Sequence, residues 1–200
     1  MRSQIAATKG DEDMKKLIGI SGKIGSGKST LAGYLMQIIK GECVIESIGN
    51  EVKRECSRIF GFDLNLAYSQ GGKNKKIYIP AQGKTMTIRE ILQWWGTDIM
   101  RTLVDPDYWI KAIDRTWGSG VIIIDDIRFP NEADYIKKHG GYLIRLDTTF
   151  TTVPLEIANH SSETELDDYQ GFDVIYRPEY GTLGEVAHDL DLSVILGQES

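Results

Sequence analysis

The stretch LIGISGKIGSGKST, residues 17–30, decides the fold of this chain. Its first residues, 17–21, are apolar or small and predict a buried β-strand. Residues 22–29 match the pattern G-x-x-x-x-G-K-[S/T] at every fixed position, and an amphipathic helix is predicted over 29–39. The glycines let the backbone turn tightly, so that successive N–H groups can point at the oxygens of a phosphate. The segment therefore predicts a strand, a phosphate-binding loop and a helix in direct succession.

The loop predicts that the protein binds a nucleoside triphosphate. Lys28 can reach the β- and γ-phosphates, and the hydroxyl of Ser29 can ligate Mg²⁺. The helix N-terminus behind the loop adds unpaired N–H donors and the positive end of its dipole. The residues predicted to bind this triphosphate, which the resemblance described below identifies as ATP, are Gly22, Lys23, Gly25, Ser26, Gly27, Lys28, Ser29 and Thr30.

The composition is typical of a soluble globular protein. The chain has 200 residues, 41% of them hydrophobic and 26% charged, and its net charge is −6 from 23 basic and 29 acidic residues. This acidic balance argues against a nucleic-acid partner, and no apolar run approaches the roughly 20 residues of a membrane span. Two cysteines, Cys43 and Cys56, do not form a disulfide or zinc pattern, which indicates a reducing, cytoplasmic compartment.

Beyond the loop, short apolar runs alternate with amphipathic stretches of helical length. Strands are predicted over 17–21, 43–48, 121–125, 141–146 and 173–176, and helices over 29–39, 51–60, 88–103, 107–117, 131–139 and 183–195. The run 121–124 is apolar on both faces, as in a central strand that helices cover on both sides. The alternation indicates right-handed crossovers and a parallel sheet. The predicted fold class is α/β, a three-layer P-loop NTPase fold with a five-stranded parallel sheet flanked by helices.

We expect a single domain over 14–200, preceded by a disordered extension over 1–13. Residues 63–87 and 147–170 fit neither a helix nor a strand pattern. Long irregular stretches inside a compact domain often serve its site, so we expect a mobile insertion at 63–87 and a lid at 147–170. A surface insertion without a function is an equal alternative for 63–87.

Two carboxylates and an arginine, Asp125, Asp126 and Arg128, follow the predicted central strand. Ligands of open α/β sheets bind at this edge. A carboxylate at this position can hold a water on Mg²⁺ beside Ser29, because Mg²⁺ prefers oxygen ligands and keeps several waters. Arg128 offers a planar fork that suits the phosphate of an acceptor. The alternative is an Asp–Arg pair that only caps the strand and the next helix.

The region after the fourth predicted strand offers no cation to a transferred phosphoryl group. Between Leu146 and Tyr176 there is no Lys or Arg, whereas seven acids lie there. The cations must therefore come from other segments, and the candidates are Lys53, Arg89, Arg101, Arg128 and Arg145. Lys73, Lys75 and Lys76 in the insertion are an alternative source, unless they belong to a solvated loop.

Several segments together resemble a known family, the deoxynucleoside monophosphate kinases of large DNA bacteriophages. They are the loop at 22–29, GNEVK at 49–53, REILQWWGTD at 89–98, DYW at 107–109, DIRFPNE at 126–132 and HSSE at 160–163. The resemblance implies transfer of the γ-phosphoryl group of ATP to a deoxynucleoside 5′-monophosphate, for DNA precursor synthesis. It implies Mg²⁺ as cofactor, ATP and the monophosphate as partners, and the host cytoplasm as location if the chain is viral. A homodimer stays open.

The resemblance also implies roles for single residues. Lys28, Arg128 and Asp126 are the predicted catalytic residues, and Ser29 with Asp126, through a water, is the predicted metal site. Asp126 and Glu132 would organise the metal and Arg128. The predicted acceptor-binding residues are Lys53, Arg89, Gln93, Gly96, Thr97, Trp109, Arg128 and Glu132. Asn131, His160 and Glu163 also belong to the segments that carry the resemblance, and their roles, like that of Asp125, stay open.

Two other functions fit parts of the sequence. Another small-molecule P-loop kinase, acting on dephospho-coenzyme A or phosphomevalonate, would share the loop, but the segment 89–98 favours the nucleotide acceptor. A regulatory module that binds ATP without turnover would also share the loop. The acids and arginine after the central strand argue against it, because a passive binder has no use for a second phosphate site.

Overall fold

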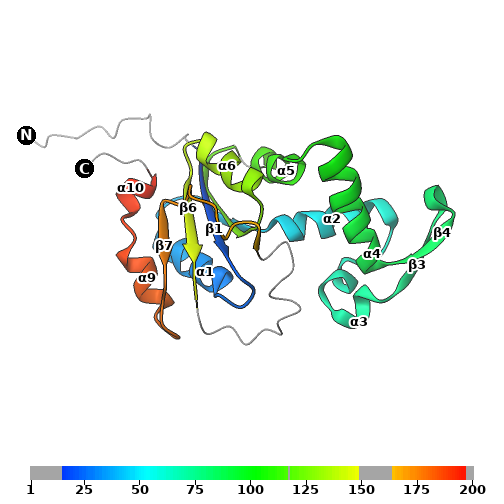
Figure 1. The fold of residues 1–200 in the computed structure, drawn as a ribbon, viewed down its shortest axis with the longest axis horizontal. Helices are drawn as coiled ribbons and strands as arrows, with labels where there is room; N and C mark the ends of the chain where they lie inside the picture. Colours follow the sequence, from blue (N-terminus) through cyan, green and yellow to red (C-terminus); the bar gives the residue numbers. More distant parts are fainter. Residues whose placement is uncertain (1–14, 117, 149–163, 197–200) are drawn as a thin grey trace, which may run out of the picture.

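A computed structural model describes residues 15–116, 118–148 and 164–196 of the chain. Its centre is a parallel sheet in the order β2-β5-β1-β6-β7 (Figure 1). The strands are β1 (Lys15–Gly22), β2 (Cys43–Glu46), β5 (Gly120–Ile127), β6 (Tyr142–Leu146) and β7 (Val174–Tyr176). The predicted five-stranded parallel sheet is therefore confirmed, and each strand lies where an apolar run predicted it.

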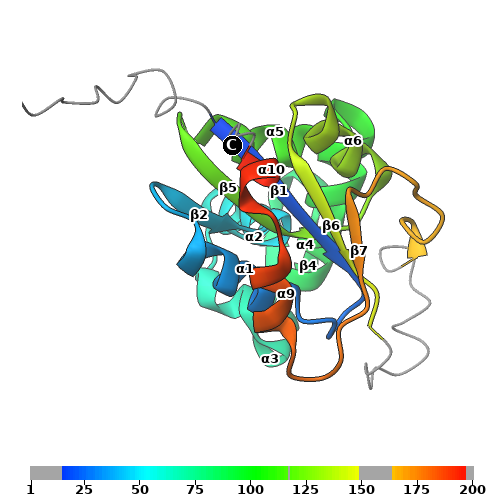
Figure 2. The same ribbon diagram turned by 90° about the vertical axis from the view of Figure 1, so that its left-hand side faces the viewer.

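The two faces of the sheet bury alternate residues of β5. Val121 and Ile123 pack into one core with α1 (Lys28–Ile38), α9 (Leu183–Asp189) and α10 (Leu192–Leu196). Ile122 and Ile124 pack into a second core with α5 (Tyr108–Thr116) and α6 (Pro130–Lys138). Figure 2 shows α1, α9 and α10 on the near face of the sheet. The alternation follows from the two-residue period of a strand and gives the predicted three layers.

A separate helical lobe extends from the C-terminal edge of the sheet, at the right of Figure 1. It contains α2 (Ile48–Phe60), α4 (Ile88–Gln93) and the π-helix η3 (Trp94–Val104). These pack on a third core that includes Cys56, Ile88 and Ile91. The predicted helix over 88–103 therefore changes its winding after Gln93, and the helix predicted over 183–195 is divided at Leu190.

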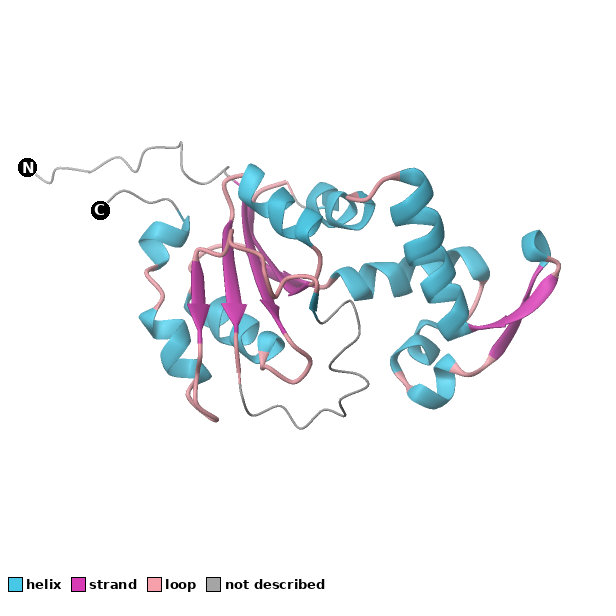
Figure 3. Cartoon of the chain, in the orientation of Figure 1, coloured by secondary structure: helices cyan, strands magenta, loops and turns pink. Residues whose placement is uncertain are grey.

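Residues 63–87 form regular structure, where the sequence patterns indicated none. They comprise η1 (Leu64–Tyr68), α3 (Gln70–Lys73), β3 (Lys76–Ile79), η2 (Pro80–Gln82) and β4 (Lys84–Thr87). The strands β3 and β4 pair as an antiparallel hairpin, which lies far from the main sheet in Figure 3. Ile77 and Ile79 alternate with exposed residues in β3, but each strand has only four residues and fully buries just one, Ile79 or Met86, which is too short a pattern to predict a strand.

Some predictions concern residues outside the described ranges. The extension 1–13, most of the 147–170 lid, and both His160 and Glu163 fall there. Among the described residues, the structure has no helix with the length and apolar character needed to cross a membrane.

Candidate functional site

A cavity of about 1280 Å³ lies between the C-terminal edge of the sheet and the helical lobe. It brings together most of the residues that the sequence predicted for the two substrates. Its lining comprises Ile24, Gly25, Gly27, Lys28, Ser29, Thr30, Ser47, Ile48, Gly49, Asn50, Val52, Lys53, Lys73, Arg89, Leu92, Gln93, Gly96, Thr97, Arg101, Asp125, Asp126, Arg128, Phe129 and Glu132.

The phosphate-binding loop joins β1 to α1 at one end of this cavity. Gly27 has φ of 90°, and a Cβ there would lie 2.4 Å from Leu183 Cδ1, so both conformation and space require glycine. Lys28 Nζ donates to the carbonyls of Gly22, at 2.7 Å, and Lys23, at 2.9 Å. Ser26 is buried beneath the loop, and its Oγ has no hydrogen-bond partner within the described part of the chain.

Ser29 and Asp125 form the oxygen pair beside the loop. Ser29 Oγ donates to Asp125 Oδ2 at 2.6 Å. Burial raises the pKa of the Asp125 carboxyl, while the hydrogen bond from Ser29 acts in the opposite direction. A hydroxyl and a carboxylate are ligands that Mg²⁺ accepts, directly or through water, so this pair fits that cation. Among the described residues there is no cluster of three or more His, Cys, Asp or Glu side chains that could hold a metal ion.

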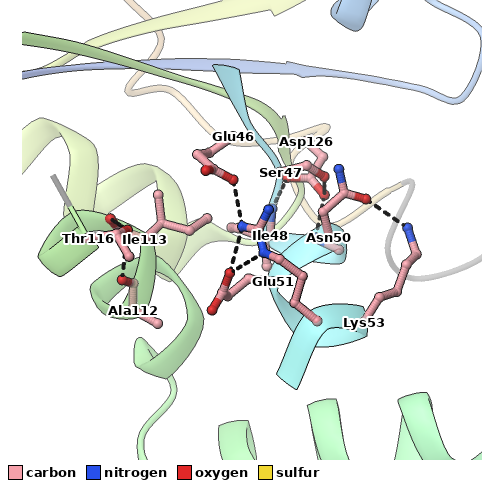
Figure 4. Close-up of polar contacts among 12 residues, drawn as sticks. Glu46, Ser47, Ile48, Asn50, Glu51, Lys53, Ala112, Ile113, Thr116 and Asp126 are labelled. Carbon is pink, nitrogen blue, oxygen red and sulfur yellow. Dashed lines mark hydrogen bonds and ion pairs between the residues drawn. The ribbon is translucent and has the colours of Figure 1, made fainter. Parts of the chain in front are cut away.

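Asp126 has a different environment from the one predicted. The sequence predicts it beside Ser29, but Asp125 holds that place. Asp126 instead accepts hydrogen bonds from Ser47 Oγ at 2.7 Å, Ile48 N at 2.7 Å and Gly49 N at 2.8 Å (Figure 4). These donors start α2, so Asp126 serves as the cap of that helix. The adjacent carboxylates are therefore divided between the loop and the helical lobe.

The other end of the cavity is lined by cations, as the sequence predicted for Lys53, Arg89 and Arg128. Lys53 Nζ donates to Asn50 Oδ1 at 3.1 Å and lies 4.6 Å from the centroid of the Tyr68 ring. Burial lowers the pKa of Lys53, and neighbouring cations lower it further. A group of like charges in a partly buried pocket is the environment that an anion stabilises.

Glu132 is buried and holds the start of α6 together with Arg101. Its carboxylate forms an ion pair with Arg101 and accepts hydrogen bonds from the backbone N–H of Arg128, at 2.9 Å, and Phe129, at 3.2 Å. The Arg101 guanidinium lies 4.6 Å from the centroid of the Phe129 ring. Burial raises the pKa of Glu132, and the charge of Arg101 opposes this. Glu132 therefore contacts Arg101 as well as the backbone of Arg128, and its role in organising a metal stays a prediction.

Trp109 does not line the cavity, although the sequence predicts it in the acceptor wall. It is 1% exposed, and its Nε1–H donates to the carbonyl of Gly96 at 2.8 Å. Trp109 therefore supports the wall from behind, while Gly96, Thr97 and Gln93 line the cavity. Asn131 also lies outside the lining, and its amide donates to Pro106 O and Asp107 Oδ1, both at 3.0 Å. The lining likewise leaves out three loop residues, Gly22, Lys23 and Ser26.

The turn that connects β2 to α2, residues 47–49, was not predicted as part of the site, although Gly49 belongs to the segment GNEVK that carries the resemblance. Ser47, Ile48 and Gly49 line the cavity and contact Asp126. The signal was present, because a serine followed by a helical pattern often marks a helix start, and this one follows a parallel strand. Phe129 also lines the cavity.

Several known proteins are similar to this chain. Residues 60–185 match the family model described as "Deoxynucleotide monophosphate kinase". A protein of Acanthamoeba polyphaga mimivirus named "Putative deoxynucleotide monophosphate kinase" is 30% identical over 173 residues, covering 80% of this chain and 86% of the relative. The "Uncharacterized protein ORF77" of Ictalurid herpesvirus 1 (strain Auburn) is 29% identical over 161 residues, covering 76% of this chain and 60% of the relative. Shikimate kinase from Aquifex aeolicus aligns with a TM-score of 0.47 and 17% identity, over 89% of this chain and 95% of that chain.

Proposed function

Because the chain belongs to the deoxynucleotide monophosphate kinase family, we propose that it transfers the γ-phosphoryl group of ATP to a deoxynucleoside 5′-monophosphate. The products are ADP and the deoxynucleoside diphosphate, a precursor of DNA, made in the cytoplasm. The observation that carries the proposal is the cavity that joins the phosphate-binding loop to a second group of cations. A protein that only binds ATP needs no such second group.

The loop end of the cavity suits the donor. Lys28 Nζ contacts two loop carbonyls, and we propose that it exchanges them for β- and γ-phosphate oxygens of ATP. The backbone N–H groups of the loop and of the start of α1 would bind the remaining phosphate oxygens. Because the loop glycines leave no side chain in the way, the phosphates can approach the backbone closely.

The lobe end suits the phosphate of the acceptor. Lys53 is carried by α2, Arg89 by α4, and Arg128 follows β5, so three different elements supply charge to one region. Guanidinium groups bind phosphate through paired hydrogen bonds, and an ammonium adds a point charge. Gln93, Gly96 and Thr97 lie farther along the same wall, where we propose that they face the sugar and base.

Magnesium fits the donor set at Ser29 and Asp125. We propose that Ser29 Oγ ligates the ion and that Asp125 holds one of its waters, which moves the metal role from Asp126 to its neighbour. When bound there, Mg²⁺ would neutralise part of the negative charge of the triphosphate. The protein needs no nucleophile of its own, because the acceptor phosphate is already an anion at neutral pH.

The proposed reaction is an in-line displacement. An oxygen of the acceptor phosphate forms a bond to the γ-phosphorus of ATP, the bond from that phosphorus to the β-γ bridging oxygen breaks, and ADP leaves. Charge spreads over the equatorial oxygens of the transferred group, where Lys28 and Arg128 can neutralise it. The protein's work is to orient the two phosphates and to stabilise this charge.

A panel of acceptors tests the proposal. ADP release is measured with ATP, Mg²⁺ and each of dAMP, dCMP, dGMP, dTMP and dephospho-coenzyme A. We expect one or more of the deoxynucleoside monophosphates to accelerate ADP release well above the rate with ATP alone. Release that no monophosphate changes would favour a binding module, and preference for dephospho-coenzyme A would favour the other kinase class.

The variant Lys28→Ala tests the role of the phosphate-binding loop at the donor end. Removal of one preorganised donor costs roughly 10²–10³ in kcat. We expect a loss of that size with every acceptor that the wild type uses. A kcat within a few-fold of the wild type would contradict the role given to the loop.

A further inference from the structure

The turn formed by η1 and α3, residues 64–73, is held by a side-chain hydrogen bond and by close backbone packing. Ser69 Oγ accepts a hydrogen bond from Gly72 N at 3.0 Å and caps α3. A Cβ at Gly72 would lie 2.3 Å from the carbonyl oxygen of Leu66, so α3 packs on η1 with no space for a side chain. The direction in which Lys73 leaves α3 is therefore set by backbone packing.

Three side chains of this turn either line the cavity or contact cations that line it. The Tyr68 ring lies 4.6 Å from Lys53 Nζ, measured to the ring centroid. The side-chain oxygen of Gln70 accepts a hydrogen bond from the Arg89 guanidinium. Lys73 lines the cavity itself, whereas neither Lys75 nor Lys76 is among the lining residues.

The charge of Lys73 acts on Lys53. Burial is the largest cause of the lowered pKa of Lys53, and the Lys73 charge is the second, while Asp126 acts in the opposite direction. Two ammonium groups that repel each other in a partly buried site raise the energy of the protein unless an anion lies between them. A phosphate dianion supplies the charge that this arrangement lacks.

The sequence explains why this turn is needed. From Asp147 to Tyr176 the chain contains no Lys or Arg, so the predicted lid region cannot bring a cation to the phosphates. The turn 64–73 belongs to the helical lobe (Figure 1), and its Lys73 brings a cation to the cavity.

We propose that Lys73 binds the phosphate group of the acceptor, and that Tyr68 and Gln70 are positioning residues that hold Lys53 and Arg89 toward the same group. The inference rests on the proposed function and deepens it, because it assigns to the insertion 63–87 the acceptor-phosphate contact. The insertion is then part of the binding site and not a surface addition.

Lys73→Ala and Lys75→Ala form the matched pair that tests this. Both remove one positive charge from the same short segment, but only Lys73 lines the cavity. The acceptor is whichever of dAMP, dCMP, dGMP and dTMP the wild type uses fastest. We expect Lys73→Ala to raise the acceptor KM about 10-fold, the usual effect of losing one charge-assisted contact, and to change the ATP KM less than about twofold. Lys75→Ala should change neither, and Lys73→Arg should restore most of the acceptor KM because it keeps the charge.

A second pair, Gly72→Ala and Gly71→Ala, tests whether the position of Lys73 matters as well as its charge. A Cβ at Gly72 meets Leu66, whereas a Cβ at Gly71 meets no atom within 4 Å. Gly72→Ala should therefore raise the acceptor KM, and adding Lys73→Ala to it should have little further effect. Gly71→Ala should behave as the wild type. Far-UV circular dichroism identifies a variant that has failed to fold, and the lysine pair then decides the question alone.

The outcomes are distinct. Equal acceptor KM values in Lys73→Ala and Lys75→Ala overturn the inference and leave the proposed function standing. An ATP KM that rises as much as the acceptor KM in Lys73→Ala also overturns it, because the residue then acts on the whole cavity. If the wild type turns over none of the four monophosphates, the proposed function fails and the inference fails with it.

Discussion

Replacing Asp126 by alanine should loosen the start of α2 and weaken acceptor binding. The carboxylate accepts three hydrogen bonds there, from Ser47 Oγ and from the N–H groups of Ile48 and Gly49. A hydrogen bond to a charged group contributes about 1.5–3 kcal/mol, and a helix-capping side chain about 0.5–2 kcal/mol. Asp126 is half-buried, so water can replace part of what is lost. We expect Asp126→Ala to lower the free energy of unfolding by about 3 kcal/mol.

The kinetic effect of this change should fall on the acceptor. Asn50 and Lys53 lie in the first turns of α2, directly after the capped residues. Displacing Lys53 would remove the charge-assisted contact that we propose it makes with the acceptor phosphate, which should raise the acceptor KM about 10-fold. Coupled ADP release at saturating ATP measures that KM, and urea unfolding followed by circular dichroism measures the free energy of unfolding.

Asp125→Ala is the informative comparison, because it removes the neighbouring carboxylate. Asp125 contacts Ser29, so its loss should raise the Mg²⁺ concentration needed for half-maximal rate and leave the acceptor KM nearly unchanged. The assignment of Asp125 to Mg²⁺ binding and of Asp126 to acceptor binding would be refuted if Asp126→Ala left the acceptor KM unchanged. It would also be refuted if both variants raised the Mg²⁺ requirement equally.

Three further predictions concern groups around the cavity. Trp109→Phe removes the hydrogen bond to the buried Gly96 carbonyl and should lower the free energy of unfolding by about 1–3 kcal/mol, with less effect on the acceptor KM. A large rise in the acceptor KM with unchanged urea unfolding would contradict this prediction. Burial and the charge of Lys73 lower the pKa of Lys53, so as pH increases the acceptor KM should begin to rise below the ordinary lysine pKa of about 10.4. In a pH profile, Lys73→Ala should move that rise to higher pH. A shift to lower pH would contradict the electrostatic coupling between the two lysines. Burial raises the pKa of Cys56 to about 12, so a thiol reagent at pH 8 should label it only in denaturant, and rapid labelling in the folded protein would show that the lobe opens.

Much of the sheet could be predicted because its strands carry strong patterns. The run 121–124 is buried on both faces, and the phosphate-binding loop fixes the order of β1 and α1. The hairpin β3–β4 could not be predicted, since its strands are short and mostly exposed. The π-helical winding of η3 also has no local signal, because it depends on how that helix packs against its neighbours.

The residues that line the cavity could be predicted where the residue type itself indicates the chemistry. They could not be predicted where tertiary packing decides which way a side chain faces. Arg89 and Gln93 lie four residues apart, so a helix places them on one face, and both line the cavity. Trp109 also lies on an amphipathic helix, but whether its ring faces the cavity or the core depends on tertiary packing. The capping of α2 by Asp126 likewise joins residues far apart in the sequence, 79 positions for the contact with Ser47.

The irregular pairing of β1 with β5 explains how two adjacent acids serve two ends of one cavity. Gly19 pairs with Ile124 and Ser21 with Ile127, so β1 advances two residues while β5 advances three. The extra residue falls at Asp125 and Asp126, and an irregularity of this kind re-aims side chains beside a site. Asp125 turns toward Ser29 and the phosphate-binding loop, whereas Asp126 turns toward Ser47 and the lobe. One strand end therefore connects the phosphate-binding loop to α2, the helix that carries Lys53. Because Asp125 and Asp126 are adjacent, a shift of one carboxylate also shifts the other.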